Sequence, residues 1–298
     1  MPNPPASPIT PRAAATAALA TDLPDHRQLA LAGGAAEGPP TLSVAGPIAR
    51  ITLQRPGRMN RLHHEDLLTL QRHVERLATH AHADGDWPEL RVLILQAEGQ
   101  AFCAGAHLAE LHAHGPDTPR LFEETLDALA RLPLPTVCRL QGGVYGGATD
   151  LALACDFRIG STAIELRMPA VRFGLHYYPG GLQRAVARLG LAAAKRLFLR
   201  AQTLPAAALL QLGYLDELVE PEALDDAVNT LAAELALGAP LAMQGMKRAL
   251  DDIATGRYQD AEVRARIRDH EARCAASADL QEGLRAFAEK RAPVVTGR

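Results

Sequence analysis

The sequence has little of what marks a membrane protein, a nucleic-acid-binding protein or a disulfide scaffold. Its 298 residues carry a formal net charge of −3, so charge gives no reason to expect a nucleic acid or an anionic membrane as a partner. No apolar run reaches the ~18 residues needed to span a bilayer. The four cysteines have neither paired nor metal-binding spacing. Three of them lie in apolar surroundings, so we expect buried, reduced thiols there.

The first 40 residues lack both a hydrophobic period and the features of a secretory signal. Residues 1–40 are dominated by Ala, Pro and small polar side chains, without the basic start and compact apolar block of such a signal. We therefore expect a flexible arm and a cytoplasmic protein. Repeated strand and helix patterns predict an α/β core over 41–220. The helical period that follows predicts an all-helical region over 221–298.

One glycine-rich stretch has the pattern of an anion-binding turn. We expect a buried strand over 135–141 and a helix over 148–154, with four glycines within six positions between them. Strand, glycine turn and helix together direct free backbone N–H groups at an anion. Asp150 follows one turn into the helix, where its carboxylate would face whatever the glycines bind. A tight connection and a favourable partner for the helix dipole remain the alternative interpretations.

A second strand ends in a similar turn of small residues. The near-continuous apolar run over 91–97 predicts a buried strand, and the segment 98–108 follows it. Two such turns can supply two backbone donors to one oxygen, which is what an oxyanion hole requires.

Both turns resemble those of the crotonase (enoyl-CoA hydratase/isomerase) superfamily. The segment 101–108, A-F-C-A-G-A-H-L, is similar to that family's first turn, and 142–156 to its second. The resemblance runs in order from about residue 41 to about 291. It implies an α/β fold, a spiral of ββα units with a C-terminal helical trimerisation region. It also implies a homotrimer or dimer of trimers, an acyl-CoA thioester as substrate, and no cofactor beyond the coenzyme A of that substrate.

The resemblance also implies roles for individual residues. The backbone amides of Ala106 and Gly147 would form the oxyanion hole. The loop 55–62 resembles one that lies along the adenosine end of coenzyme A, although solvated arginines are an alternative there. Near the C-terminus the corresponding positions reach the acyl pocket and a phosphate across a trimer interface; an interface aromatic and an exposed lysine are the alternatives. The expected substrate-binding residues are Arg55, Arg58, Ala104, His107, Leu108, Gly146, Phe287 and Lys290.

The acid–base residues depart from those of the family's hydratases, which use two glutamates. Asp150 stands at the first position and Ala170 at the second. Losing a general acid or base reduces a rate by roughly 10²–10⁴. An enzyme of hydratase/isomerase type is still the leading hypothesis, with Asp150 catalytic. A weakly catalytic acyl-CoA-binding homologue is one alternative.

A second alternative is a decarboxylase of a malonyl-type or methylmalonyl-type thioester. Tyr145 and Tyr177 resemble positions of the family's decarboxylases, which make the enolate without a base. Tyr177 would then orient the leaving carboxylate. The His of those enzymes corresponds to Ala106, whereas this chain has His107 one residue later. His176 and Tyr178 are further candidates, and packed core side chains are the alternative for each.

Five histidines lie between residues 63 and 82, but their spacing suits no single metal site. No carboxylate or cysteine cluster completes one in this stretch. We therefore expect the polar face of a helix and predict no metal site.

Overall fold

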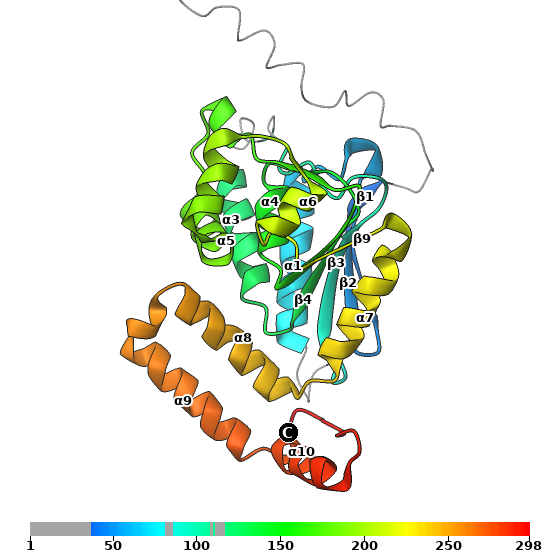
Figure 1. Ribbon diagram of the computed structural model, residues 1–298, viewed down its shortest axis with the longest axis vertical. Coiled ribbons are helices and arrows are strands. Elements are labelled where there is room, and N and C mark those ends of the chain that lie inside the picture. The colour runs from blue at the N-terminus through cyan, green and yellow to red at the C-terminus, as the bar shows by residue number, and fades with distance from the viewer. Residues whose placement is uncertain (1–36, 81–85, 108–109, 111–116) are drawn as a thin grey trace, which may run out of the picture.

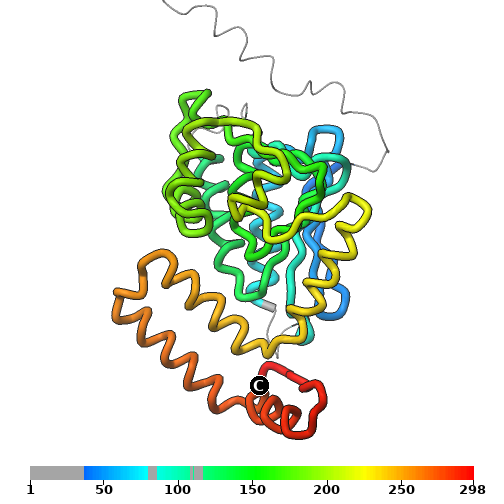
Figure 2. The backbone as a smooth tube through the Cα atoms, in the orientation of Figure 1, coloured from blue at the N-terminus to red at the C-terminus, as the bar shows by residue number. Residues whose placement is uncertain are grey.

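A computed structural model describes residues 37–80, 86–107, 110 and 117–298 (Figure 1). The expected arm therefore lies almost entirely outside the described residues. The chain forms an α/β body followed by a separate group of helices, and Figure 2 shows this group as an arm below the body. No helix among the described residues is long and apolar enough to cross a bilayer.

A six-stranded sheet forms the centre of the body, in the order β1-β2-β3-β4-β6-β9. β1 and β2 form an antiparallel hairpin, and every later pair in this sheet is parallel. The strands are β1 (Gly38–Ala45), β2 (Ile48–Gln54), β3 (Val92–Ala97), β4 (Thr136–Leu140), β6 (Phe157–Ser161) and β9 (Glu217–Val219).

Alternate residues of the central strands belong to two apolar cores on opposite faces of the sheet. On β3, Leu93 and Leu95 join the larger core, whereas Val92 and Ile94 pack with Leu224 and neighbouring side chains of α7. This explains the continuous apolar run in the sequence, because a parallel strand covered on both faces needs apolar residues at every position. In Figure 1, α7 (Leu224–Ala236) covers one face of the sheet.

The larger core lies under the helices of the other face. The predicted amphipathic helix over 64–82 is α1, with Leu67, Leu70, Val74 and Leu77 buried as its period requires. Here α1 spans His64–His80, and the other helices that contribute side chains to this core are α3 (Asp117–Ala130), α4 (Ala148–Leu153), α5 (Pro179–Arg200) and α6 (Ala206–Gln211).

A second sheet of three short strands was not fully predicted. β5 (Val144–Tyr145), β7 (Glu165–Arg167) and β8 (Leu204–Pro205) form it, in that order. β5 is a two-residue strand inside the glycine-rich turn, so it is too short to show an alternating pattern. After this sheet's second strand, α5 begins at Pro179, since proline suits the first position of a helix.

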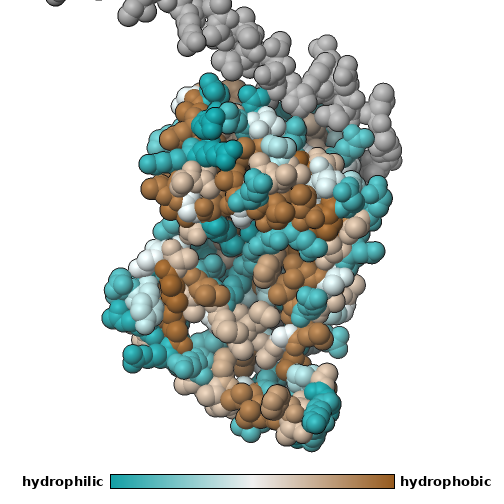
Figure 3. All heavy atoms as spheres, in the orientation of Figure 1, coloured by the Kyte–Doolittle hydropathy of each residue, from teal (hydrophilic) through white to brown (hydrophobic). Residues whose placement is uncertain are grey.

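The all-helical region leaves apolar side chains on its surface. α8 (Pro240–Ala254) and α9 (Ala261–Ala275) form a hairpin, and α10 (Ala278–Glu289) follows. Figure 3 shows apolar side chains on this region and on the body above it. The exposed ones include Met246, Leu250, Ile253, Leu284 and Phe287.

Candidate functional site

Backbone hydrogen bonds join the two turns that the sequence singled out. The Cys103 amide donates to the Gly143 oxygen (3.2 Å), and the Tyr145 amide donates to the Cys103 oxygen (3.0 Å). These bonds form an isolated parallel bridge between Cys103 and Val144. The turn after β3 and the turn before α4 therefore lie side by side.

Gly105 permits this close approach. Its φ is +79°, a conformation that favours glycine, and a Cβ there would lie 2.7 Å from both the Gly147 nitrogen and the Tyr145 oxygen. Any side chain at residue 105 would push the two turns apart.

Two amides at this junction have no hydrogen-bond acceptor in the part of the chain that the structure describes: those of Ala106 and Gly147. Adjacent amides differ, because His107 donates to the Leu62 oxygen and Gly146 to the Arg167 oxygen, both at 2.9 Å. Gly147 is the residue that precedes α4, as expected. The structure thus brings two unoccupied donors to neighbouring positions on the two turns.

Asp150 lies on α4 and is fully engaged by other side chains. Its carboxylate, 1% exposed, accepts hydrogen bonds from Arg184 Nε (2.9 Å) and Nη2 (2.7 Å), and from the Tyr178 hydroxyl. Arg184, on α5, also donates to Asp127 (2.5 Å). Although burial lowers the pKa of Arg184, its bonds to Asp150 raise it more, so the guanidinium stays charged. The bidentate pair fixes the Asp150 side chain in place.

Two tyrosines extend this network. The rings of Tyr177 and Tyr178 stack with centroids 4.4 Å apart, and the Tyr177 hydroxyl donates to that of Tyr178 at 3.4 Å. Burial, with the Asp150 charge as a further cause, raises the pKa of Tyr177. Burial and its two neighbours raise the pKa of Tyr178 as well, so both phenols remain protonated. Tyr177 is therefore connected to Asp150 indirectly, through the hydroxyl group of Tyr178.

Several other expected residues have partners of their own. Ala170 is buried, and its methyl group offers no acid or base. The Tyr145 hydroxyl donates to Glu165 (2.5 Å). Arg55 is bound by Asp66, at 2.9 Å from its Nε, and by Glu65, so its guanidinium has partners within the chain.

Three further residues expected to contact coenzyme A differ in what they can offer a ligand. Arg58 is largely exposed, 3.9 Å from Glu37. The Ala104 amide donates to Met59 (2.8 Å), so only its other atoms are available to a ligand. Leu108 lies outside the described residues.

Phe287 and Lys290 are not near the two turns of the same chain. Phe287 is 87% exposed on α10, and Lys290 follows that helix. Figure 1 shows α10 at the opposite end of the molecule from α4. One chain therefore does not bring these two side chains to the junction of the turns.

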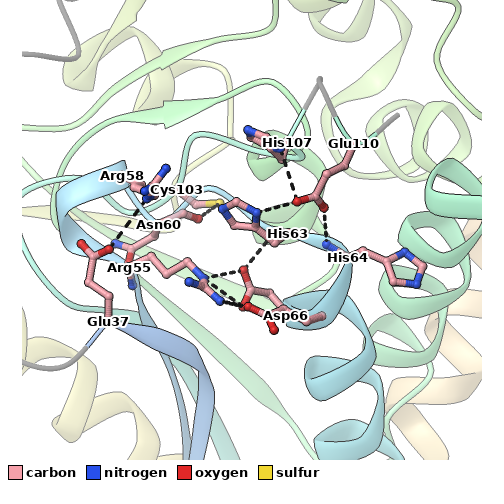
Figure 4. A network of polar contacts seen from close by, with 11 residues as sticks. Glu37, Arg55, Arg58, Asn60, His63, His64, Asp66, Cys103, His107 and Glu110 are labelled. Atoms are coloured by element: carbon pink, nitrogen blue, oxygen red, sulfur yellow. Dashed lines mark hydrogen bonds and ion pairs between the residues drawn. The ribbon is translucent and has the colours of Figure 1, made fainter. Parts of the chain in front are cut away.

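Sequence reasoning missed two features of this region. Arg184 is 34 residues from Asp150 and was not considered. His63, His107 and Glu110 also come together beside Ala106, although the histidines of 63–82 alone suggested no site (Figure 4). For the contact of Arg184 with Asp150, the one available signal was an arginine among apolar residues on α5. No local spacing indicated the group of His63, His107 and Glu110.

Comparisons with known proteins agree with this fold. The family model described as enoyl-CoA hydratase/isomerase matches residues 44–298. An enoyl-CoA isomerase/hydratase of Mycosarcoma maydis is 35% identical over 222 residues, covering 72% of this chain and 79% of that protein. The methylmalonyl-CoA decarboxylase of Escherichia coli strain K12 is 30% identical over 221 residues, covering 72% and 84%.

A solved structure gives the same result. The enoyl-CoA hydratase of Bacillus anthracis superposes with a TM-score of 0.78 at 25% identity, covering 88% of this chain and all of that one (100%). The expected crotonase-type α/β fold and the expected class of enzyme are confirmed. This chain therefore belongs to the enoyl-CoA hydratase/isomerase family.

Proposed function

We propose that the chain binds an acyl-CoA thioester and stabilises its enolate with the amides of Ala106 and Gly147. The support is geometric: two neighbouring turns each offer an N–H without an acceptor among the described residues. Two donors about 2.7–3.1 Å from a developing oxyanion stabilise it by several kcal/mol, provided they are fixed in place beforehand. Coenzyme A enters as part of the substrate, and the proposed chemistry uses no other cofactor.

The state of Asp150 favours a reaction that needs no carboxylate base. A general base must accept a proton from the substrate. The Asp150 oxygens already accept hydrogen bonds from Arg184 and Tyr178, and Ala170 offers no second carboxylate. This ion pair is the observation that carries our choice: decarboxylation of a malonyl-type thioester.

Such a step balances without a base. The bond between the α-carbon and the carboxylate breaks, CO₂ leaves, and its bonding electron pair forms the enolate. The enolate is then protonated at the α-carbon by a phenol of the Tyr177–Tyr178 pair, which is protonated and connected to Asp150. The phenol regains its proton from solvent. Phe122 lies between the tyrosine pair and the proposed oxyanion hole. Its ring centroid is 6.0 Å from that of Tyr178, and its ring packs against Gly147.

Hydration or isomerisation of an enoyl-CoA is the second candidate, because the relative of Mycosarcoma maydis carries both activities in its name. A direct comparison separates the two. CO₂ release from malonyl-CoA and methylmalonyl-CoA, without hydration of crotonyl-CoA, is the expected result. Hydration that is lost in Asp150→Asn would contradict the decarboxylase, and tight thioester binding with no turnover would favour the weakly catalytic binder.

We further propose that the protein assembles as a homotrimer or a dimer of trimers. The exposed apolar side chains of α8 and α10, with Phe287 at 87% exposure, support this, since large apolar surfaces usually mark an interface. Neighbouring subunits would then supply Phe287 and Lys290 to the site. Light scattering after size-exclusion chromatography tests this, and a monomer at micromolar concentration would contradict it.

A further inference from the structure

A group of three potential metal ligands lies beside Ala106. His63 precedes α1, His107 lies near the end of the first turn, and Glu110 comes three residues later (Figure 4). One donor atom from each lies within 4.8 Å of the other two. No other group of three or more His, Cys, Asp or Glu residues meets this criterion within the described ranges.

The backbone holds the two histidines together independently of their side chains. The Leu62 amide donates to the Gly105 oxygen, and the His107 amide donates back to the Leu62 oxygen, both at 2.9 Å. Residues 63 and 107 thus leave the same short bridge side by side. Their rings stack with centroids 4.6 Å apart. The site is therefore formed in advance by the fold.

One carboxylate oxygen of Glu110 accepts a backbone hydrogen bond, and the other faces both histidines. Its Oε2 accepts the His64 amide (2.7 Å). Its Oε1 lies 2.7 Å from His63 Nδ1 and 3.5 Å from His107 Nδ1. An amide that orients a ligating carboxylate is a usual feature of the residues around a metal ion.

Each histidine retains an unpartnered, buried ring nitrogen. Within the described residues, His63 Nε2 and His107 Nδ1 have no hydrogen-bond partner. Burying such an atom without a partner is unfavourable, so each one requires an explanation. A carboxylate oxygen already engaged by His63 Nδ1 leaves His107 Nδ1 without a hydrogen bond, whereas an ion bound by the Nδ1 atoms of both rings would give His107 Nδ1 a partner.

We propose that His63, His107 and Glu110 bind one divalent transition-metal ion, with Zn²⁺ as the best-suited ion. Two imidazoles and one carboxylate suit zinc, whereas Mg²⁺ and Ca²⁺ prefer oxygen ligands alone. Zinc bonds of about 2.0–2.2 Å in a tetrahedron place neighbouring donor atoms about 3.4 Å apart. The two distances to Glu110 Oε1, 2.7 and 3.5 Å, lie on either side of that value. Water would complete the coordination.

Bound metal would connect the chain before α1 to the turn that carries Ala106. This effect is separate from the proposed reaction, because binding is measured without any thioester.

The test uses the full-length, tag-free protein and Zn²⁺ alone. Isothermal titration of the metal-free protein should show one equivalent of Zn²⁺ bound. His107→Ala and Glu110→Gln should each weaken binding by at least about tenfold. His73→Ala is the matched control: the His73 ring contacts the Pro40 oxygen at 2.9 Å and is not one of the three proposed ligands, so the variant should bind Zn²⁺ with the affinity of the wild type.

Two further readouts keep the outcome decisive. The visible spectrum of Co²⁺ bound in place of Zn²⁺ reports a four-coordinate nitrogen and oxygen site, and circular dichroism confirms that each variant is folded. A wild type that binds no Zn²⁺ overturns the proposal. So does equal binding by the wild type, His107→Ala and Glu110→Gln. If a variant does not fold, the wild-type spectrum decides the question: an octahedral Co²⁺ spectrum would also overturn the proposal.

Discussion

Two groups of polar side chains, one around Asp150 and the other around His63, differ in how completely their hydrogen bonds are satisfied. In the Asp150 group, Arg184 pairs with two carboxylates and Tyr178 completes the contacts. In the His63 group, two imidazoles compete for one carboxylate and each retains an unpartnered nitrogen. A satisfied network fixes its side chains, whereas an unsatisfied buried polar atom requires an explanation, and a bound ion is one such explanation. Our proposals therefore make the first group a support for the site and the second a binding site for an ion.

Among the variants that test this comparison, Arg184→Met should cause the largest loss of stability. It leaves the Asp150 charge buried without its cationic partner, so we expect the unfolding free energy to fall by about 3–5 kcal/mol. Arg131→Met is the control, since Arg131 is exposed and lies 3.5 Å from the same Asp127; it should change stability by less than about 1 kcal/mol. Urea denaturation measures both. Equal losses in the two variants would show that Arg184 is not a structural support.

A smaller effect is expected at the contact between the turns. Gly105→Ala combines an unfavourable positive φ with a Cβ 2.7 Å from the Gly147 nitrogen. Gly146→Ala has the positive φ alone, because the nearest atom to its Cβ would be 3.9 Å away. The strain should lower stability by about 1–2 kcal/mol in Gly146→Ala and by more in Gly105→Ala. Thermal and urea unfolding test the order, and the reverse order would contradict the close approach.

Substitution of a side chain in the His63 group should change stability much less than substitution of Arg184 in the Asp150 group. In metal-free protein, His107→Leu replaces a half-buried imidazole whose Nδ1 has no hydrogen-bond partner in the described chain. We expect a change of less than about 1 kcal/mol in unfolding free energy, since no good hydrogen bond is lost. A loss comparable to that of Arg184→Met would mean that the imidazole is already satisfied without an ion.

The pH dependence of this group follows from its environment. Burial, together with the nearby charges of His63 and Arg61, lowers the pKa of His107 below its usual value. The unfolded chain therefore binds a proton at His107 more readily than the folded one. The contribution of His107 to stability is complete above the ordinary pKa, and it decreases as the pH falls through that pKa toward the lower folded value.

The smallest effect concerns cysteine reactivity. Burial raises the pKa of Cys103 to about 12, and the thiol donates to the Asn60 oxygen at 3.0 Å behind the first turn. Iodoacetamide at about pH 8 should therefore leave Cys103 unmodified in the native protein, because the thiolate is the nucleophile. Cys274 is partly exposed and serves as the internal comparison. Mass spectrometry locates the label, and modification of Cys103 at the rate of Cys274 would contradict its burial.

The sequence predicted the parts of the fold that depend on local pattern. The apolar runs of β3 and β4, the period of α1 and the two glycine turns were all readable, because strand and helix periods and turn chemistry are local properties. The contacts of Asp150 with Arg184 and of His63 with Glu110 were not. They join residues 34 and 47 positions apart and depend on how helices and turns pack. The sequence therefore indicated Asp150 as a catalytic carboxylate, whereas the structure surrounds that carboxylate with hydrogen-bond donors.

The most direct test of the central claim compares two substitutions at Gly147. Its φ of −60° suits proline, and both Gly147→Ala and Gly147→Pro add a Cβ that meets the Phe122 ring. Only proline removes the N–H group. If this amide stabilises the enolate, kcat for CO₂ release should fall by about 10²–10³-fold more in Gly147→Pro than in Gly147→Ala. Equal kcat values for two folded variants would contradict an oxyanion hole at this position.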